Sequence, residues 1–181
     1  MNRKDLFCRT ATSLDATQIA QVHVDSWRVA YKDLLPADLL ENLSVAQRSR
    51  MWDRLLAANS EKTVIYVAES GGLIVGFALA GPARETDQRL NQGEIYAIYV
   101  DGSAWGSGIG YKLMEASHHF LKQMVFSSMV LWVLDGNEQA IRFYERYGFV
   151  RDVSQQGVKI DQFGNVPVRE LRYELTLDQS V

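Results

Sequence analysis

Glycines are concentrated in one short stretch of this chain, YVDGSAWGSGIGYKL (residues 99–113), in which four glycines fall within nine positions. The stretch separates an alternating apolar run from a run with helical periodicity. At such a strand-to-helix junction, backbone N–H groups and the positive end of the helix can hold a phosphate without a charged side chain. Glycine also lets a ligand come close to the backbone. Gly106, Gly108 and Gly110 therefore predict a cradle for a phosphate or pyrophosphate.

Two common phosphate-binding motifs do not fit this stretch. A P-loop needs Lys followed by Ser or Thr after its last glycine, and no such pair occurs here. A dinucleotide-binding motif needs glycine at the sixth position counted from Gly106, where this chain has Tyr111. That motif also belongs after the first strand of its domain, whereas these glycines lie in mid-chain. A glycine-rich turn that serves packing alone stays open as the alternative.

The elements that position these glycines follow from hydrophobic periodicity. The expected strands cover residues 6–12, 63–70, 73–83, 93–100 and 128–134, with two long strands in the tail, residues 149–177. The first expected helix is capped by Ser13 or Asp15 and ends at about Tyr31, and the others cover residues 35–44, 45–59, 109–124 and 137–148. This order predicts a mixed α/β fold: a twisted, mostly antiparallel sheet of about seven strands with helices on both faces.

The strand at residues 93–100 and the tail carry two more specific predictions. Alternation puts Glu94, Tyr96, Ile98 and Val100 on one face of the strand, and Ile95, Ala97 and Tyr99 on the other. In the tail, Gly164–Asn165 is the expected hairpin turn.

Composition places limits on the function. The chain has 181 residues, a formal net charge of -3 and a single cysteine, Cys8. The negative balance argues against nucleic-acid binding through bulk positive charge, and one cysteine forms no internal disulfide, as is usual in the cytoplasm. No apolar run reaches the roughly 20 residues of a membrane helix. We expect one domain, residues 1–181, in the cytoplasm, without a nucleic-acid or membrane partner and, lacking a metal-binding motif, without a metal.

Two blocks of the sequence resemble the GNAT superfamily of acyl-CoA-dependent N-acetyltransferases. EIYAIYVDGSAWGSGIGYKLM (residues 94–114) is similar to the end of the family's fourth strand and its acyl-CoA-binding signature, in which Gln or Arg precedes the glycines. LWVLDGNEQAIRFYERYGFV (residues 131–150) is similar to a later family segment, and its matching positions are Asn137, Ala140, Phe143, Tyr144, Gly148 and Phe149. The order of strands and helices extends the resemblance across nearly all of the chain.

The resemblance implies an acetyl-CoA site that includes the glycine cradle. In the family, the fourth and fifth strands splay apart and the pantetheine arm lies between them. Backbone groups of Ile98, Tyr99 and Val100 would then pair with the arm or with the thioester carbonyl, and Asn137 would contact the arm near its thiol end. The pyrophosphate would be held by the N–H groups of Gly106, Ser107, Gly108, Ile109, Gly110 and Tyr111.

The resemblance also implies roles in a direct attack of an amine on the thioester. Tyr144 stands where the family often has the general acid that protonates the leaving thiolate, and the alternative is an aromatic residue of the core. Glu94 occupies the position at which some branches have a catalytic glutamate. It would act as the base through water, or directly on an amine that reaches that far, and the alternative is an ordinary charged residue at a strand start. Trp27 and Tyr31 lie in the region that forms a wall of the family's acceptor site. Core packing is the commoner role for aromatic residues spaced four apart on a helix.

This chain departs from the family pattern at Trp105, where members usually have Gln or Arg near the pyrophosphate. Tryptophan carries no charge and has a single N–H donor. We therefore expect binding through backbone amides and the helix dipole, with Lys112 nearby, and a lower affinity than in a relative with Arg at this position.

The function expected from the resemblance is N-acetyl transfer from acetyl-CoA to a primary amine in a ternary complex. The acceptor stays open between a small-molecule amine and a peptide or protein amine. Two other functions also stay open: a non-catalytic acyl-CoA-binding or sensing module on the same fold, and a protein that binds the phosphates of another nucleotide. A homodimer also stays open, because the long tail strands of two copies of the chain could pair with each other.

Overall fold

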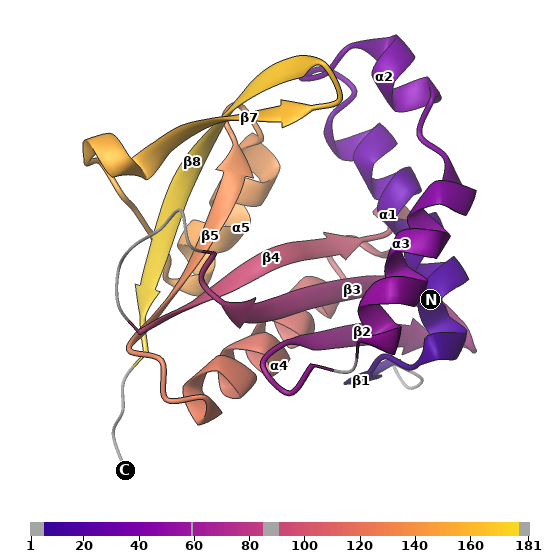
Figure 1. Cartoon of the computed structure of the whole chain (residues 1–181), viewed down its shortest axis with the longest axis horizontal. Coiled ribbons are helices and arrows are strands. Elements are labelled where there is room, and N and C mark those ends of the chain that lie inside the picture. Colours follow the sequence, from indigo (N-terminus) through magenta and orange to yellow (C-terminus); the bar gives the residue numbers. More distant parts are fainter. Residues whose placement is uncertain (1–5, 59, 85–90, 178–181) are drawn as a thin grey trace.

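The computed structural model of the chain describes residues 6–58, 60–84 and 91–177 (Figure 1). The strands are β1 (Leu6–Thr10), β2 (Val64–Ser70), β3 (Leu73–Pro82), β4 (Gln92–Val100), β5 (Ser128–Leu134), β6 (Val150–Arg151), β7 (Val158–Phe163) and β8 (Val166–Thr176). The helices are α1 (Ala16–Ala30), α2 (Ala37–Glu41), α3 (Val45–Ala57), α4 (Ile109–Gln123) and α5 (Glu138–Tyr147). Among the described residues, no helix combines the length and the hydropathy that crossing a membrane requires.

The strands form one sheet in the order β1-β2-β3-β4-β5-β8-β6, and β7 pairs with β8. Neighbouring strands are antiparallel except β4 and β5, which run parallel. This arrangement confirms the expected mixed α/β fold. The sheet has one short strand, β6, beyond the seven that the periodicity indicates.

Helices cover both faces of the sheet, which gives the molecule three layers (Figure 1). On one face, Ile19 of α1 and Trp52 of α3 pack against Phe77 of β3, and all three are almost fully buried. On the other face, α4 and α5 contribute buried residues such as Met114 and Ile141 to a second cluster. We call these faces the α1/α3 side and the α4/α5 side.

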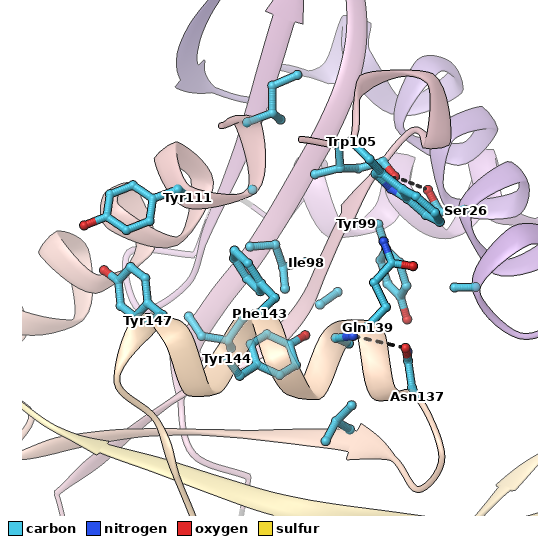
Figure 2. Close-up of a pocket in the computed structure, with 18 of the residues that line it drawn as sticks. Ser26, Ile98, Tyr99, Trp105, Tyr111, Asn137, Gln139, Phe143, Tyr144 and Tyr147 are labelled. Carbon is cyan, nitrogen blue, oxygen red and sulfur yellow. Dashed lines mark hydrogen bonds between the residues drawn. The ribbon is translucent and has the colours of Figure 1, made fainter. Parts of the chain in front are cut away.

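The backbone of β4 departs from strict alternation. Its register with β3 shifts so that consecutive residues of β3 lie opposite Ile95 and Ala97, and Tyr96 has no residue opposite it. Such an extra residue is a β-bulge, which bends and twists the strand. Ile95 therefore packs on the α4/α5 side together with Ile98 (labelled in Figure 2), whereas Ala97 and Tyr99 pack on the α1/α3 side. The predicted grouping of Ile95 with Ala97 and Tyr99 is wrong, because pairing with β3 sets the bulge.

The tail confirms one prediction and corrects another. Phe163 lies opposite Val166, so the expected turn at Gly164–Asn165 joins β7 to β8. The first of the two long strands is broken: β6 ends at Arg151, and a 3₁₀ turn precedes β7. At this turn Gly157 lies so close to the chain of Asp152 that a Cβ would stand 1.9 Å from its carbonyl oxygen. The close approach folds the chain out of the strand, and the apolar pattern contains no sign of it.

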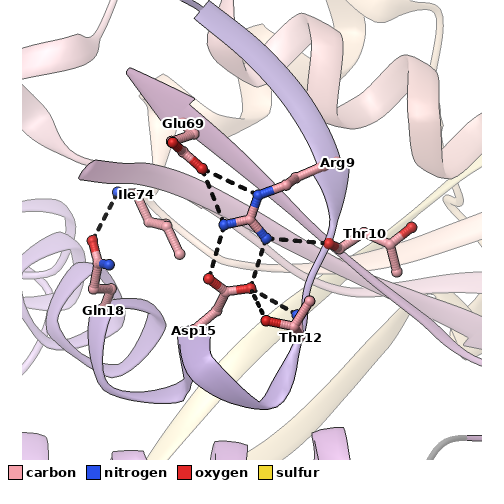
Figure 3. A network of polar contacts seen from close by, with 7 residues as sticks. All are labelled: Arg9, Thr10, Thr12, Asp15, Gln18, Glu69 and Ile74. Atoms are coloured by element: carbon pink, nitrogen blue, oxygen red, sulfur yellow. Dashed lines mark hydrogen bonds and ion pairs between the residues drawn. The ribbon is translucent and has the colours of Figure 1, made fainter. Parts of the chain in front are cut away.

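An ion-pair network joins β1 to the beginning of α1 (Figure 3). Arg9 donates to both carboxylate oxygens of Asp15, at 2.7 and 2.9 Å, and to the carboxylate of Glu69 on β2, at 3.0 and 3.1 Å. The backbone N–H of Thr12 donates to Asp15 as well, at 2.7 Å. The hydrogen bonds from Arg9 outweigh burial and lower the pKa of Asp15 to about 2. The network fixes α1, whose far end forms a wall of the cleft described next.

Candidate active site

A cleft opens where β4 and β5 part. The two strands pair only over Gln92–Ile95 and Ser128–Leu131, whereas β3 stays paired with β4 as far as Val100. Beyond Ile95, the edge of β4 that faces β5 therefore has no strand partner among the described residues. The cleft has a volume of about 470 Å³ and is lined by parts of α1, β4, the glycine stretch, α4, β5 and α5.

The glycine stretch forms a cradle of free donors at the beginning of α4. Gly106 and Gly108 have φ values of 73° and 90°, and no atom of a described residue lies within 4 Å of the place where either would carry a Cβ. Left-handed backbone of this kind favours glycine. Free backbone N–H groups, which donate to no described residue, belong to Gly106, Gly108, Ile109, Gly110 and Tyr111. All five residues line the cleft, and their donors fit a phosphate group.

Ser107 is the one expected cradle residue that does not line the cleft. Its hydroxyl donates to the carbonyl of Ala104, and its N–H lies 3.4 Å from the same oxygen. Ser107 thus closes the turn that carries the cradle.

Tyr144 lies on the wall of the cleft that α5 provides. The residue is 8% exposed, and its ring packs edge-on against Phe143 and Phe149. Its hydroxyl donates to no described residue. Burial, with a smaller contribution from Tyr99, raises the pKa of this phenol, so that it keeps its proton throughout the neutral range.

Tyr31 and Tyr99 bring a hydroxyl pair to the opposite wall. Their oxygens lie 3.1 Å apart, which joins α1 to the free part of β4, and both residues line the cleft. Burial raises the pKa of both phenols. Behind them, His23 stacks on Tyr99 with ring centroids 5.3 Å apart, and burial lowers the pKa of this histidine to about 3. His23 is therefore neutral, and it accepts a hydrogen bond from the indole of Trp52 at 3.3 Å.

Trp27 lies one layer behind the cleft and not in its lining. Its ring stacks on Phe163 with centroids 4.8 Å apart and meets the ring of Tyr31 edge-on at 5.2 Å. The guanidinium of Arg48 lies 5.1 Å from the centre of the indole. Trp27 is thus placed to fix Tyr31, and only Tyr31 of the two expected acceptor residues faces the cleft.

Glu94 also lies outside the lining of the cleft. It is 1% exposed, and its carboxylate accepts from the side chain of Arg84 and, at 3.0 Å, from the backbone N–H of Arg84. The structure therefore does not bring Glu94 together with Tyr144 at the cleft surface. Its expected role as the base stays a prediction.

Asn137 is the N-cap of α5, and its side-chain oxygen accepts from the backbone N–H of Ala140 at 3.2 Å. The remainder of its carboxamide is available to a ligand, because Asn137 lines the cleft. Figure 2 shows it at the opposite end of α5 from Tyr147. The expected contact of Asn137 with the arm near its thiol end stays a prediction.

Trp105 braces the free edge of β4. Its indole N–H donates to the carbonyl oxygen of Val100 at 2.9 Å, and the hydroxyl of Ser26 donates to the same oxygen at 3.3 Å (Figure 2). Two donors occupy both lone pairs of this carbonyl, so a ligand has to pair with other backbone groups of β4. Lys112 does not replace the missing charge, because its ammonium lies 3.5 Å from the carbonyl of Leu6 on β1 and outside the cleft lining.

Several features of the site have no counterpart in the sequence predictions, and two of them bear on the ligand. One is the brace between Trp105 and Val100, which no local pattern indicates. The other is Arg146 of α5, which lines the cleft. Helical spacing could have identified Arg146, because it lies three residues after Phe143 and so shares its face.

Among the described residues, no group of three or more His, Cys, Asp or Glu side chains gathers as metal ligands do.

Comparison with known proteins assigns the chain to a family. Residues 18–149 match the model of the Acetyltransferase (GNAT) family. YuaI of Bacillus subtilis, described as an uncharacterized N-acetyltransferase, is 35% identical over 160 residues, which are 86% of this chain and 89% of that protein. The chain therefore belongs to the GNAT family of acetyltransferases and is an acyltransferase, as the two sequence blocks implied.

Two solved structures share the fold at low sequence identity. The PaiA N-acetyltransferase of Thermoplasma acidophilum, in complex with coenzyme A, has a TM-score of 0.71 and 16% identity over 93% of this chain and 99% of its own. YncA of Salmonella typhimurium, with its cofactor acetyl-CoA, has a TM-score of 0.70 and 18% identity over 98% of this chain and 97% of its own.

Proposed function

We propose that this protein moves the acetyl group of acetyl-CoA to a primary amine. The observation that carries the proposal is that one cleft contains both the free N–H donors of the glycine cradle and the unpaired edge of β4. The donors suit a pyrophosphate. The strand edge suits an extended arm with amide groups, which can pair with it as an added strand would. Two fold neighbours whose structures contain coenzyme A or acetyl-CoA support this choice of donor.

In this proposal, acetyl-CoA supplies the activated thioester carbonyl. The backbone N–H of Ile98, on the free edge of β4, stabilises the charge that develops on the carbonyl oxygen. Tyr144 donates its proton to the leaving sulfur. The support for this role is a phenol on the cleft wall that is protonated and makes no hydrogen bond to a described residue.

The acceptor amine enters from the side of Tyr31 and Tyr99, with Trp27 fixing the ring of Tyr31 from behind. The amine must lose a proton during the attack. We assign this proton to Glu94, which receives it through water because its carboxylate lies outside the cleft lining. Both small-molecule and peptide amines remain candidate acceptors.

A thermal-shift measurement with a matched pair of glycine variants tests the choice of donor. Gly108 in the cradle and Gly72 in the β2–β3 turn have φ values of 90° and 81°, and no atom of a described residue lies near the missing Cβ of either. Substitution by Ala should therefore strain both backbones to a similar extent, by about 1–2 kcal/mol. We expect coenzyme A to raise the melting temperature of the wild type and of Gly72→Ala, and to have little effect on Gly108→Ala. Stabilisation of the wild type by ATP or NAD alone would contradict the proposal.

A further inference from the structure

The cleft contains a single formally charged side chain among the described residues that line it. That residue is Arg146, in the last turn of α5, and no Lys, Asp or Glu accompanies it. Arg146 makes no ion pair with any described residue, and its side chain is exposed. Arg142, one turn earlier on the same helix, pairs with Glu138 at 3.8 Å and does not line the cleft.

Arg146 lies at the end of the cleft that contains the glycine cradle. Its neighbour Tyr147 meets Tyr111, with ring centroids 5.3 Å apart, and Tyr111 belongs to the first turn of α4. One turn earlier on α5, the ring of Phe143 lies 3.5 Å from the position of a Cβ on Gly110. Figure 2 shows Tyr111 and Tyr147 together on one side of the cleft, far from Asn137. The last turn of α5 thus faces the cradle, and the first turn of α5 belongs to the other end.

Coenzyme A carries two kinds of phosphate, a pyrophosphate and a single phosphate on the 3′ position of its ribose. The free N–H groups of the cradle can satisfy the pyrophosphate. The 3′-phosphate needs further donors, and neither Trp105 nor Lys112 supplies a charge inside the cleft. A guanidinium has the planar arrangement of donors that suits a phosphate.

We propose that Arg146 binds the 3′-phosphate of coenzyme A and so makes the protein select coenzyme A over its 3′-dephospho form. The inference rests on the proposed use of acetyl-CoA and adds a residue on the opposite wall from the glycine cradle. It also explains how an uncharged Trp105 is compatible with binding of a highly charged donor. The positive charge comes from Arg146 on α5 and not from the residue before the glycines, Trp105.

Calorimetric titration of two ligands into the intact protein and three variants tests this assignment. Coenzyme A and 3′-dephospho-coenzyme A are titrated into the wild type, Arg146→Gln, Arg146→Lys and Arg142→Gln. A charge-assisted contact predicts that the wild type binds coenzyme A about tenfold or more tightly than the dephospho form. Arg146→Gln should lose this preference by weakening coenzyme A alone. Arg146→Lys should keep part of it, and Arg142→Gln should keep all of it.

Three results would overturn the assignment, and they differ from one another. Equal binding of the two ligands by the wild type would mean that nothing recognises the 3′-phosphate. An unchanged preference in Arg146→Gln would place that contact on another residue. Equal weakening of both ligands would place Arg146 on the pyrophosphate. If the wild type bound neither ligand, the proposed use of acetyl-CoA would itself be wrong.

Discussion

Replacing Tyr144 by Phe removes one hydroxyl from the cleft wall and leaves the ring in place. The ring packs against Phe143 and Phe149, and the hydroxyl donates to no described residue. The change therefore leaves no buried acceptor without a partner, and we expect the free energy of unfolding to change by less than about 1 kcal/mol. Coenzyme A affinity should also be retained, because the backbone groups that bind its phosphates are untouched.

The expected effect on catalysis is much larger than the effect on stability. A positioned general acid contributes about 10²- to 10⁴-fold to a rate, which corresponds to about 3–5 kcal/mol of transition-state stabilisation at 1.36 kcal/mol per tenfold. Burial raises the pKa of Tyr144, so the acid form persists to higher pH than in a free tyrosine. The kcat of the wild type should therefore not fall on the alkaline side below about pH 10 through loss of this proton.

Steady-state assay of coenzyme A release, together with calorimetry, separates the two effects. Tyr66→Phe is the matched control, because Tyr66 lies on β2 and does not line the cleft. We expect kcat to fall by about 10²-fold or more in Tyr144→Phe and to stay unchanged in Tyr66→Phe. Full activity of Tyr144→Phe would show that another group protonates the leaving sulfur.

Three further perturbations have defined outcomes. Trp105→Arg should bind coenzyme A about threefold to tenfold more tightly in calorimetry at low salt, and unchanged affinity would show that charge at this position is unimportant. Glu94→Gln and Arg84→Met both break the ion pair between the buried Glu94 carboxylate and the half-exposed Arg84 side chain and should lower the melting temperature, but only Glu94→Gln should reduce kcat/KM by about 10²-fold; equal activity of the two would make Glu94 a structural residue. The hydrogen bonds from Arg9 lower the pKa of Asp15 from an ordinary 3.8 to about 2, and they stabilise the fold by about 2 kcal/mol above about pH 4. This stabilisation should disappear as the pH falls from 4 to 2 in urea unfolding of the wild type, and Asp15→Asn should lack that step; parallel curves would refute the role of its ion pair with Arg9.

Features that depend only on residues close together in the sequence could be predicted from the sequence. Gly106 and Gly108 indicate a cradle because positive φ values and free N–H groups at the beginning of a helix are local properties. The positions of Asn137 as the N-cap of α5 and of Tyr144 within this helix are local in the same sense, because capping and helical spacing depend on nearby residues. Gly164 gives the hairpin turn because the turn needs only its own two residues.

Features that depend on distant pairing could not be read in this way. The bulge at Tyr96 is set by the register of β3 against β4, and it reverses the expected side of Ile95. The sequence leaves Glu94 open between a base that acts at a distance and an ordinary charged residue, and it contains no sign that Arg84 pairs with its carboxylate. Trp27 shares a helical stripe with Tyr31, yet contact with Phe163 on β7 places it behind the cleft.

The most direct test of the proposed function is an acetyl-transfer assay with the purified protein. Acetyl-CoA is combined with a panel of primary amines that includes small molecules and peptides, and mass spectrometry follows both free coenzyme A and acetylated amine. We expect at least one amine to be acetylated in step with coenzyme A release, with both products reduced about 10²-fold in Tyr144→Phe. Coenzyme A binding without release across the panel would contradict an acetyltransferase and would instead favour a sensing module on the same fold.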